Sequence, residues 1–99
     1  MDRRIIYDAT ADIAILAVAK FLKENAGVKT ANKFLDDIDK KVRQIVMFPD
    51  SGHNVELHSD IQYLIIREHY NLYYTITEDG DIYLLDFWNS KRNPNTAPY

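Results

Sequence analysis

The order of the segments on either side of Phe48-Pro49-Asp50-Ser51-Gly52 constrains the fold of this chain more than any other feature. Two segments with helical periodicity precede this pentapeptide, and segments with the alternation of β-strands follow it. A residue before proline avoids the α region, so Phe48 predicts the end of the second helix. Gly52 then supplies a flexible corner. Helices followed by a run of strands predict an α+β fold.

The first helix is predicted to follow a short strand at residues 3–7 and to run from Ala9 to about Asn25. Asp8 precedes this helix as its N-cap, and Gly27 follows it as a turn residue. Apolar side chains at spacings of three and four residues predict that one face is buried. That face consists of Ile13, Leu16, Ala17 and Phe21, widened by Ile15, Val18 and Leu22.

The second helix is predicted from about Lys29 to Met47, with a single apolar stripe for packing against the rest of the protein. The stripe consists of Ala31, Leu35, Ile38, Val42 and Ile45. The connection between the two helices is only a few residues long, which predicts an antiparallel hairpin.

Three strands are predicted after the pentapeptide, at residues 62–68, 71–77 and 82–88. The sequence Glu78-Asp79-Gly80-Asp81 is a strong hairpin turn between the last two. Residues 54–59 are compatible with either a short strand or an irregular crossing. The predicted fold is therefore α+β, βααβββ, in which an N-terminal strand and an antiparallel helical hairpin accompany an antiparallel meander sheet.

Alternation along the last strand places apolar side chains on both of its faces, which predicts a strand with neighbours on both sides. One face would hold Ile82, Leu84, Asp86 and Trp88, and the other Tyr83, Leu85 and Phe87. The chain has 99 residues and no repeats, so we expect a single domain over residues 1–99 with an irregular tail from about residue 93.

Composition excludes several kinds of site. The chain has no Cys, which excludes disulfides and thiolate metal sites and is typical of a cytoplasmic location. Its most apolar stretch, residues 13–18, is too short to span a membrane. Residues 1–54 hold nine Lys or Arg and eight Asp or Glu, whereas residues 55–99 hold three and seven. This acidic strand half disfavours nucleic-acid binding.

No metal or cofactor is predicted. His53, His58 and His69 are five and eleven residues apart, which matches no common zinc spacing. Ser51 and His53 suggest a nucleophile and a base, but no oxyanion-hole sequence accompanies them.

The arrangement of these segments resembles the RelE/ParE superfamily of toxins from type II toxin–antitoxin pairs. The resemblance covers nearly the whole chain. It is carried by Ile5-Ile6-Tyr7, by Ala31, Phe34 and Leu35, by the pentapeptide at residues 48–52, by Arg67 with Tyr70, by Tyr73-Tyr74-Thr75-Ile76, by Ile82-Tyr83-Leu84-Leu85-Asp86-Phe87-Trp88, and by Ser90-Lys91-Arg92-Asn93-Pro94.

This resemblance implies a growth-inhibiting, plasmid-stabilising toxin that a cognate antitoxin neutralises in a hetero-oligomer. RelE-like members cut mRNA on the ribosome, whereas ParE-like members poison DNA gyrase without cutting RNA. The ParE-like branch is favoured here, with no membrane partner. A ribosome-dependent mRNA endoribonuclease is the first alternative, and a non-toxic interaction module of the same fold is the second.

The nuclease alternative implies a particular set of residues. RelE-like enzymes use Lys and Arg on the sheet, with a late Tyr or His, to align the 2′-hydroxyl and stabilise the phosphorane without a metal. Arg67 matches the strand arginine of that pattern. For catalysis, Arg67 would have to converge with Lys91, Arg92 and either His58 or Tyr99.

A structural role for Arg67 is equally open, since a strand arginine commonly pairs with a nearby carboxylate. The candidates for that carboxylate are Glu56, Glu68 and Asp86.

The leading hypothesis is binding without bond-making. Trp is frequent at interface hot spots, and aromatic grooves accept helices or strands of partners. The residues predicted to face the target or the antitoxin are Arg67, Tyr73, Trp88, Lys91 and Arg92. The cations of the helical hairpin are predicted to meet the target, and the antitoxin is predicted to dock on apolar surface between the hairpin and the sheet.

Overall fold

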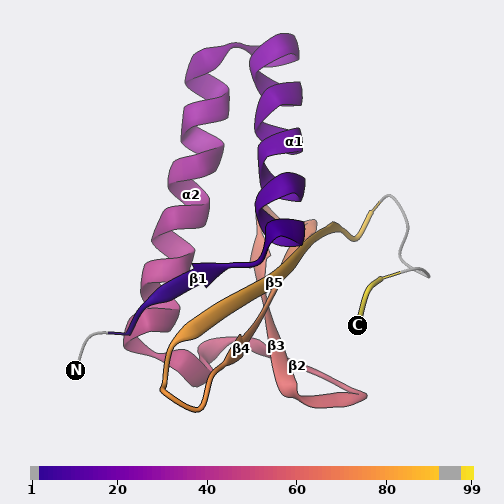
Figure 1. Ribbon diagram of the computed structural model, residues 1–99. Coiled ribbons are helices and arrows are strands. Elements are labelled where there is room, and N and C mark those ends of the chain that lie inside the picture. The colour runs from indigo at the N-terminus through magenta and orange to yellow at the C-terminus, as the bar shows by residue number, and fades with distance from the viewer. Residues whose placement is uncertain (1–2, 92–96) are drawn as a thin grey trace.

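The structure is a computed structural model that describes residues 3–91 and 97–99. A two-helix hairpin stands on a twisted sheet (Figure 1). In chain order the elements are β1 (Ile5–Tyr7), α1 (Ala9–Ala26), α2 (Val28–Met47), a 3-10 turn η1 (Pro49–Ser51), β2 (His53–Val55), β3 (His58–Ile66), β4 (Tyr70–Ile76) and β5 (Ile82–Asn89). The predicted α+β order is confirmed, and the undecided segment after Gly52 forms β2 and the start of β3.

One residue fixes the start of α1, and another fixes its junction with α2. Asp8 caps α1, because its side-chain oxygen accepts a 2.9 Å hydrogen bond from the Thr10 amide. A single residue, Gly27, separates α1 from α2. Its φ of 97° lies in the left-handed region that only glycine adopts without strain, so this position requires glycine.

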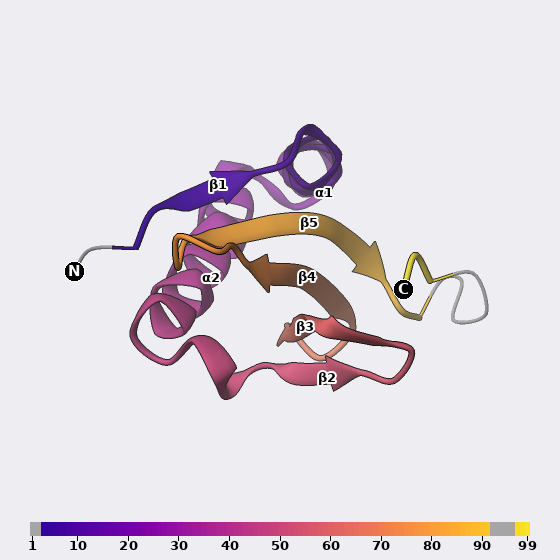
Figure 2. The ribbon, with the colours of Figure 1, turned by 60° about the horizontal axis from the view of Figure 1, so that its bottom comes forward.

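The five strands form one sheet in the order β1-β5-β4-β3-β2, as Figure 2 shows from β1 at the top to β2 at the bottom. Strands β2 to β5 form the predicted antiparallel meander. β1 adds to its edge in parallel, with Ile5 opposite Ile82. β5 therefore has a neighbour on each side, as its two apolar faces predict.

The main core lies between the hairpin and one face of the sheet. The apolar stripe predicted for α2 is confirmed, although Leu35 is only half-buried and Phe34, fully buried, adds to it. Phe34 packs edge-on against the rings of Tyr70 and Phe87, with 5.9 Å between ring centroids in each case. Aromatic packing at Phe34 thus adds to the aliphatic contacts that join α2 to the sheet.

The buried face predicted for α1 is wrong for four of its residues and right for Ile15, Val18 and Leu22, which pack against the core. Ile13, Leu16 and Phe21 are 68%, 53% and 62% exposed, and Ala17 is also exposed. The face that packs instead consists of Ala11, Ile15 and Ala19, with Ala14, Val18 and Leu22 beside them. α1 is apolar on two sides, and periodicity does not reveal which side meets the sheet. The small side chains of Ala11 and Ala19 lie on this face, which lets α1 approach α2 and β5 closely.

The predicted alternation of β5 is wrong beyond Leu84. Tyr74 pairs with Leu84 and Tyr73 with Asp86, so Leu85 is an extra residue that forms a β-bulge. Ile82, Leu84 and Phe87 consequently share the main core, whereas Leu85 and Trp88 pack on the other face. The Asp86 side chain accepts a 2.8 Å hydrogen bond from the Phe87 amide at this bulge.

The pentapeptide is held in place by Tyr74, whose ring is fully buried. The Tyr74 hydroxyl accepts a 3.1 Å hydrogen bond from the Gly52 amide, and the Pro49 carbonyl and the Gln62 side chain lie within hydrogen-bonding distance of it. A Cβ atom at Gly52 would meet Cε1 of that ring at 2.8 Å. The corner after α2 is therefore shaped by close approach to a tyrosine from β4.

Candidate functional site

Arg67 lies in the turn between β3 and β4, beyond the end of the strand in which it was predicted. Its Nε donates a 2.8 Å hydrogen bond to Oδ2 of Asp37 in α2, and its guanidinium carbon lies 5.7 Å from the centroid of the Phe34 ring. The hydrogen bond from Arg67 lowers the pKa of Asp37. The ion pair expected as the alternative for Arg67 is thus present, but its partner is Asp37 and none of the three carboxylates proposed from the sequence.

The backbone of this turn is strained. Arg67 and Glu68 have φ angles of 50° and 73°, a conformation that costs a residue other than glycine about 1–3 kcal/mol. The His69 carbonyl accepts 2.8 Å hydrogen bonds from both the amide and the hydroxyl of Ser90, which follows β5. These bonds and the Asp37 ion pair hold the turn against the helix side of the sheet.

The other face of the sheet, away from the helices, carries a cluster of rings that we call the aromatic face. It consists of His53, His58, Tyr63, Tyr73 and Tyr99. Ring centroids are 5.2 Å apart for His53 and Tyr63, 5.7 Å for Tyr63 and Tyr73, and 5.1 Å for Tyr73 and Tyr99. Leu85 and Trp88 pack nearby against buried Val55, Ile61 and Tyr73.

Of the residues proposed for catalysis, His58 and Tyr99 lie in contact, with 5.8 Å between their ring centroids. Arg67, however, contacts α2 on the opposite side of the sheet. Arg67 and His58 are also at opposite ends of β3, and nine residues of extended chain span about 30 Å. Lys91 is exposed after β5, where its amide bonds to the Asn89 side chain; Arg92 lies outside the described residues.

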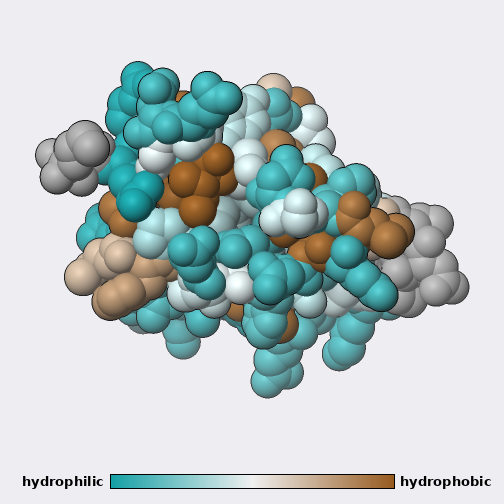
Figure 3. Space-filling view, turned by 90° about the horizontal axis from the view of Figure 1, so that it is seen from below, coloured by the Kyte–Doolittle hydropathy of each residue, from teal (hydrophilic) through white to brown (hydrophobic). Residues whose placement is uncertain are grey.

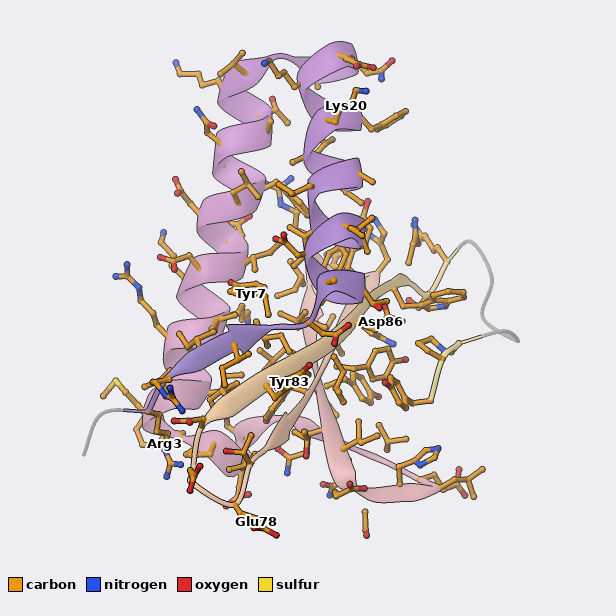
Figure 4. The ribbon with its side chains drawn as sticks, viewed as in Figure 1. Arg3, Tyr7, Lys20, Glu78, Tyr83 and Asp86 are labelled. Atoms are coloured by element: carbon orange, nitrogen blue, oxygen red, sulfur yellow. The ribbon has the colours of Figure 1, made fainter. Side chains whose placement is uncertain are left out.

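The electrostatics of the aromatic face disfavour an RNA phosphate. Partial burial, followed by the nearby carboxylate of Asp86, raises the pKa of Tyr99. Figure 4 shows Asp86 on β5, the strand that also carries Tyr83. The Tyr83 hydroxyl donates a 2.7 Å hydrogen bond to Asp8, which lowers the pKa of that carboxyl.

A hollow of about 610 Å³, the α1 groove, lies between α1 and the sheet. Its α1 wall consists of Ala14, Ala17, Val18 and Phe21, and its sheet wall of Tyr70, Phe87 and Asn89. The exposed Ile13 and Leu16 extend apolar surface along the same helix. The underside of the molecule, in contrast, shows scattered hydrophobic areas among hydrophilic ones (Figure 3). The sequence signal for this groove was an excess of apolar residues on α1, which was misread as core.

The three histidines lie apart from one another. His53 stacks on Tyr63, His58 contacts Tyr99 and His69 contacts Tyr70. In residues 3–91 and 97–99, no three His, Asp or Glu side chains form a group able to hold a metal ion. No helix in that part of the chain is long and apolar enough to cross a membrane.

Comparison with known proteins places this geometry in context. A family profile described as "ParE toxin of type II toxin-antitoxin system, parDE" matches residues 4–94. A chain of a chromosomal ParDE toxin–antitoxin system from P. aeruginosa is 16% identical, with a TM-score of 0.72 over 88% of this chain and 95% of that one. A doubly substituted E. coli toxin RelE in the free state is 12% identical, with a TM-score of 0.61 over 95% of this chain and 90% of that one. No curated protein sequence matches.

Proposed function

This chain belongs to the ParE toxin family of type II toxin–antitoxin systems, and from that premise we propose that it inhibits its target by binding, with DNA gyrase as the target. An antitoxin neutralises it by covering apolar surface. Family membership supports the toxin role, and the identity of the target is the part that experiment must test.

The observation that carries the choice of binding over RNA cleavage is the position of Arg67. Metal-free cleavage needs cations and proton-transfer groups within hydrogen-bond reach of one phosphate. Arg67 is committed to Asp37 on the helix side, while His58 and Tyr99 meet on the aromatic face. Among the described residues, no cation hydrogen-bonds or stacks within that cluster of rings, and Asp86 adds negative charge near Tyr99.

The surface offered to the target comprises Trp88 at the end of β5 and Lys91 in the turn that follows, whereas Tyr73 of the adjacent strand β4 is buried beneath it. Trp88 is half-buried and packs on the same cluster as Tyr73. A half-buried Trp beside a buried Tyr is the kind of anchor on which interface hot spots centre. The outer face of α2 adds exposed cations to the molecule, and Arg43 there is paired with Asp39 at 2.9 Å.

The α1 groove is the proposed antitoxin site. It is open, most of its lining side chains are apolar, and it is bordered by Phe21, a large side chain that α1 leaves exposed. Contiguous exposed apolar surface of this kind marks interaction sites in soluble proteins. An amphipathic helix of the antitoxin would lay its apolar side chains between Phe21 and the sheet.

The direct test adds the purified chain to purified gyrase and relaxed plasmid. The proposal expects loss of supercoiling, or accumulation of cleaved plasmid, at stoichiometric toxin. The same preparation, added to ribosomes carrying a defined mRNA, is expected to leave the message intact. Cleaved message with normal supercoiling would overturn the proposal in favour of the endoribonuclease. No effect in either assay, with no growth arrest on expression, would indicate the non-toxic interaction module.

One observation supports the endoribonuclease alternative, namely that His58 and Tyr99 lie in contact beside Tyr73. If this contact forms part of a catalytic site, His58→Ala and Tyr99→Phe would each abolish mRNA cleavage and leave the fold unchanged. Under the binding proposal, neither substitution creates or removes any cleavage.

A further inference from the structure

The outer edge of β3 is only partly covered. β2 pairs with β3 between His58 and Tyr63. Leu64, Ile65 and Ile66 pair with β4 on one side and, within the part of the chain that the structure describes, with no strand on the other. An antiparallel strand directs alternate backbone N–H and C=O groups to each side. This stretch therefore presents backbone groups able to accept another strand.

A trough runs along that open edge, between α2 and β3. It consists of two adjoining hollows of about 490 and 240 Å³, which share Lys41 and Gln44 as lining residues. Ile66 lines the larger hollow, and Leu64 and Ile65 line the smaller. We call this feature the α2–β3 trough. It shares no lining residue with the α1 groove.

The trough is positively charged although the chain has a net charge of −3. Its lining includes Lys40, Lys41, Arg43 and Arg67 and a single carboxylate, Asp37. Arg67 neutralises Asp37, and Arg43 is paired with Asp39. Lys40 and Lys41 are exposed and, among the described residues, have no hydrogen-bond or ion-pair partner. Two uncommitted cations thus lie beside the exposed Ile65 and an open strand edge.

We propose that the α2–β3 trough binds an extended acidic peptide segment of a partner protein, which adds to the sheet in line with β2. Residues 64–66 offer room for a strand of about 10 Å. Backbone hydrogen bonds to β3 supply affinity, and alternate side chains supply specificity. Partner residues beside Leu64 and Ile66 face α2, where acids meet Lys40 and Lys41. The residue between them lies over Ile65, which is 39% exposed, and is apolar.

Charge alone would also attract a nucleic-acid phosphate. The open backbone edge favours an acidic peptide over a nucleic acid, because a strand edge pairs with a peptide backbone and a nucleic acid has no such backbone.

The test titrates a blocked pentapeptide that alternates Glu and Val into the ¹⁵N-labelled full chain. The proposal expects saturable amide shifts at Leu64, Ile65 and Ile66, with slowed hydrogen exchange there. The Lys40→Glu/Lys41→Glu variant is expected to bind at least tenfold more weakly, and Lys40→Gln/Lys41→Gln to lose less. Lys29→Glu, at the far end of α2, is the matched control and is expected to bind as the unaltered chain does. Circular dichroism of each variant checks that it is folded.

Matched probes separate the two sources of affinity. Replacing every Glu of the peptide by Gln removes the charge, and N-methylating alternate backbone amides removes strand pairing; both changes are expected to weaken binding. The proposal is overturned if the N-methylated peptide binds equally well, or if Lys29→Glu weakens binding as much as the double variant. It is also overturned if the shifts map to the α1 groove, if no probe saturates, or if an oligothymidylate of equal charge shifts these amides and the peptide does not.

Discussion

Arg67 and Asp37 are thirty residues apart in the sequence and form a 2.8 Å ion pair that joins the β3–β4 turn to the middle of α2. The Arg67 guanidinium also lies over the Phe34 ring, with its carbon 5.7 Å from the ring centroid. Arginine is thus used here to close the fold, at a position where a phosphate-binding role was the main alternative.

The Arg67–Asp37 pair predicts coupled effects on stability. Arg67→Ala and Asp37→Ala are each expected to lower the midpoint of urea unfolding, and the double variant is expected to lose less than the two single losses added together. The control is Arg43→Ala, which breaks an exposed i,i+4 pair and is expected to cost about 0.5 kcal/mol or less. Strict additivity of the first two substitutions would show that the pair contributes nothing.

Loss of the Tyr74 hydroxyl oxygen is predicted to lower the free energy of unfolding strongly. Tyr74→Phe leaves the Gly52 amide and the Gln62 side chain without their common partner, which costs about 1–3 kcal/mol. For a domain of this size, each kcal/mol lowers Tm by about 4–8 °C. Tyr63→Phe, on the aromatic face, is the control and is expected to change the free energy of unfolding by less than about 0.5 kcal/mol. Equal effects of the two substitutions would contradict the role assigned to Tyr74.

The acid limb of the stability curve is predicted to depend on Asp81. The amide of Arg4, followed by its guanidinium, holds the pKa of this carboxyl below its usual value. The folded carboxyl therefore stays ionised to lower pH than the unfolded one. Its contribution is complete above a pH of about 4 and is lost as pH falls through the lower folded pKa. Asp81→Asn should flatten the loss of stability below pH 4, whereas Asp79→Asn in the same turn should leave the slope unchanged.

A substitution in the α1 groove is predicted to weaken antitoxin binding and to leave the stability of the fold nearly unchanged. Phe21→Glu places a charge on a side chain that is already 62% exposed, so the free energy of unfolding is expected to change little. Antitoxin affinity, measured by calorimetry, is expected to fall at least thirtyfold, as for a hot-spot residue. The control is Leu57→Glu, at an 87% exposed position between β2 and β3, which is expected to bind normally. Normal binding by the Phe21 variant would move the antitoxin site elsewhere.

A pattern of apolar residues predicts which face of a helix or strand is buried only where it allows a single choice of face. α2 has one apolar stripe, so its buried face was predicted correctly from Ala31 to Ile45. α1 is apolar on two sides, and only packing against β5 decides that Ile15 is buried and Leu16 exposed. The bulge at Leu85 leaves no mark in the sequence, because the residues around it are apolar on both faces.

The candidate site was less predictable than the fold, since its contacts join distant parts of the chain. The choice of Asp37 as the partner of Arg67 depends on how the hairpin leans on the sheet. The meeting of His58 with Tyr99 depends on the path of the final residues. Neither relationship is encoded in local spacing.

The extra residue in β5 has a consequence for how such a protein can change over time. On one face of the sheet the strand contributes Phe87 to the α1 groove, and on the other face it contributes Leu85 and Trp88 to the opposite surface. A regular strand that kept all eight residues of β5 and had no bulge would exchange the sides on which Phe87 and Trp88 lie. The proposed neutralising surface and the proposed target surface therefore share one backbone register, and a shift of one residue beyond the bulge would alter both together.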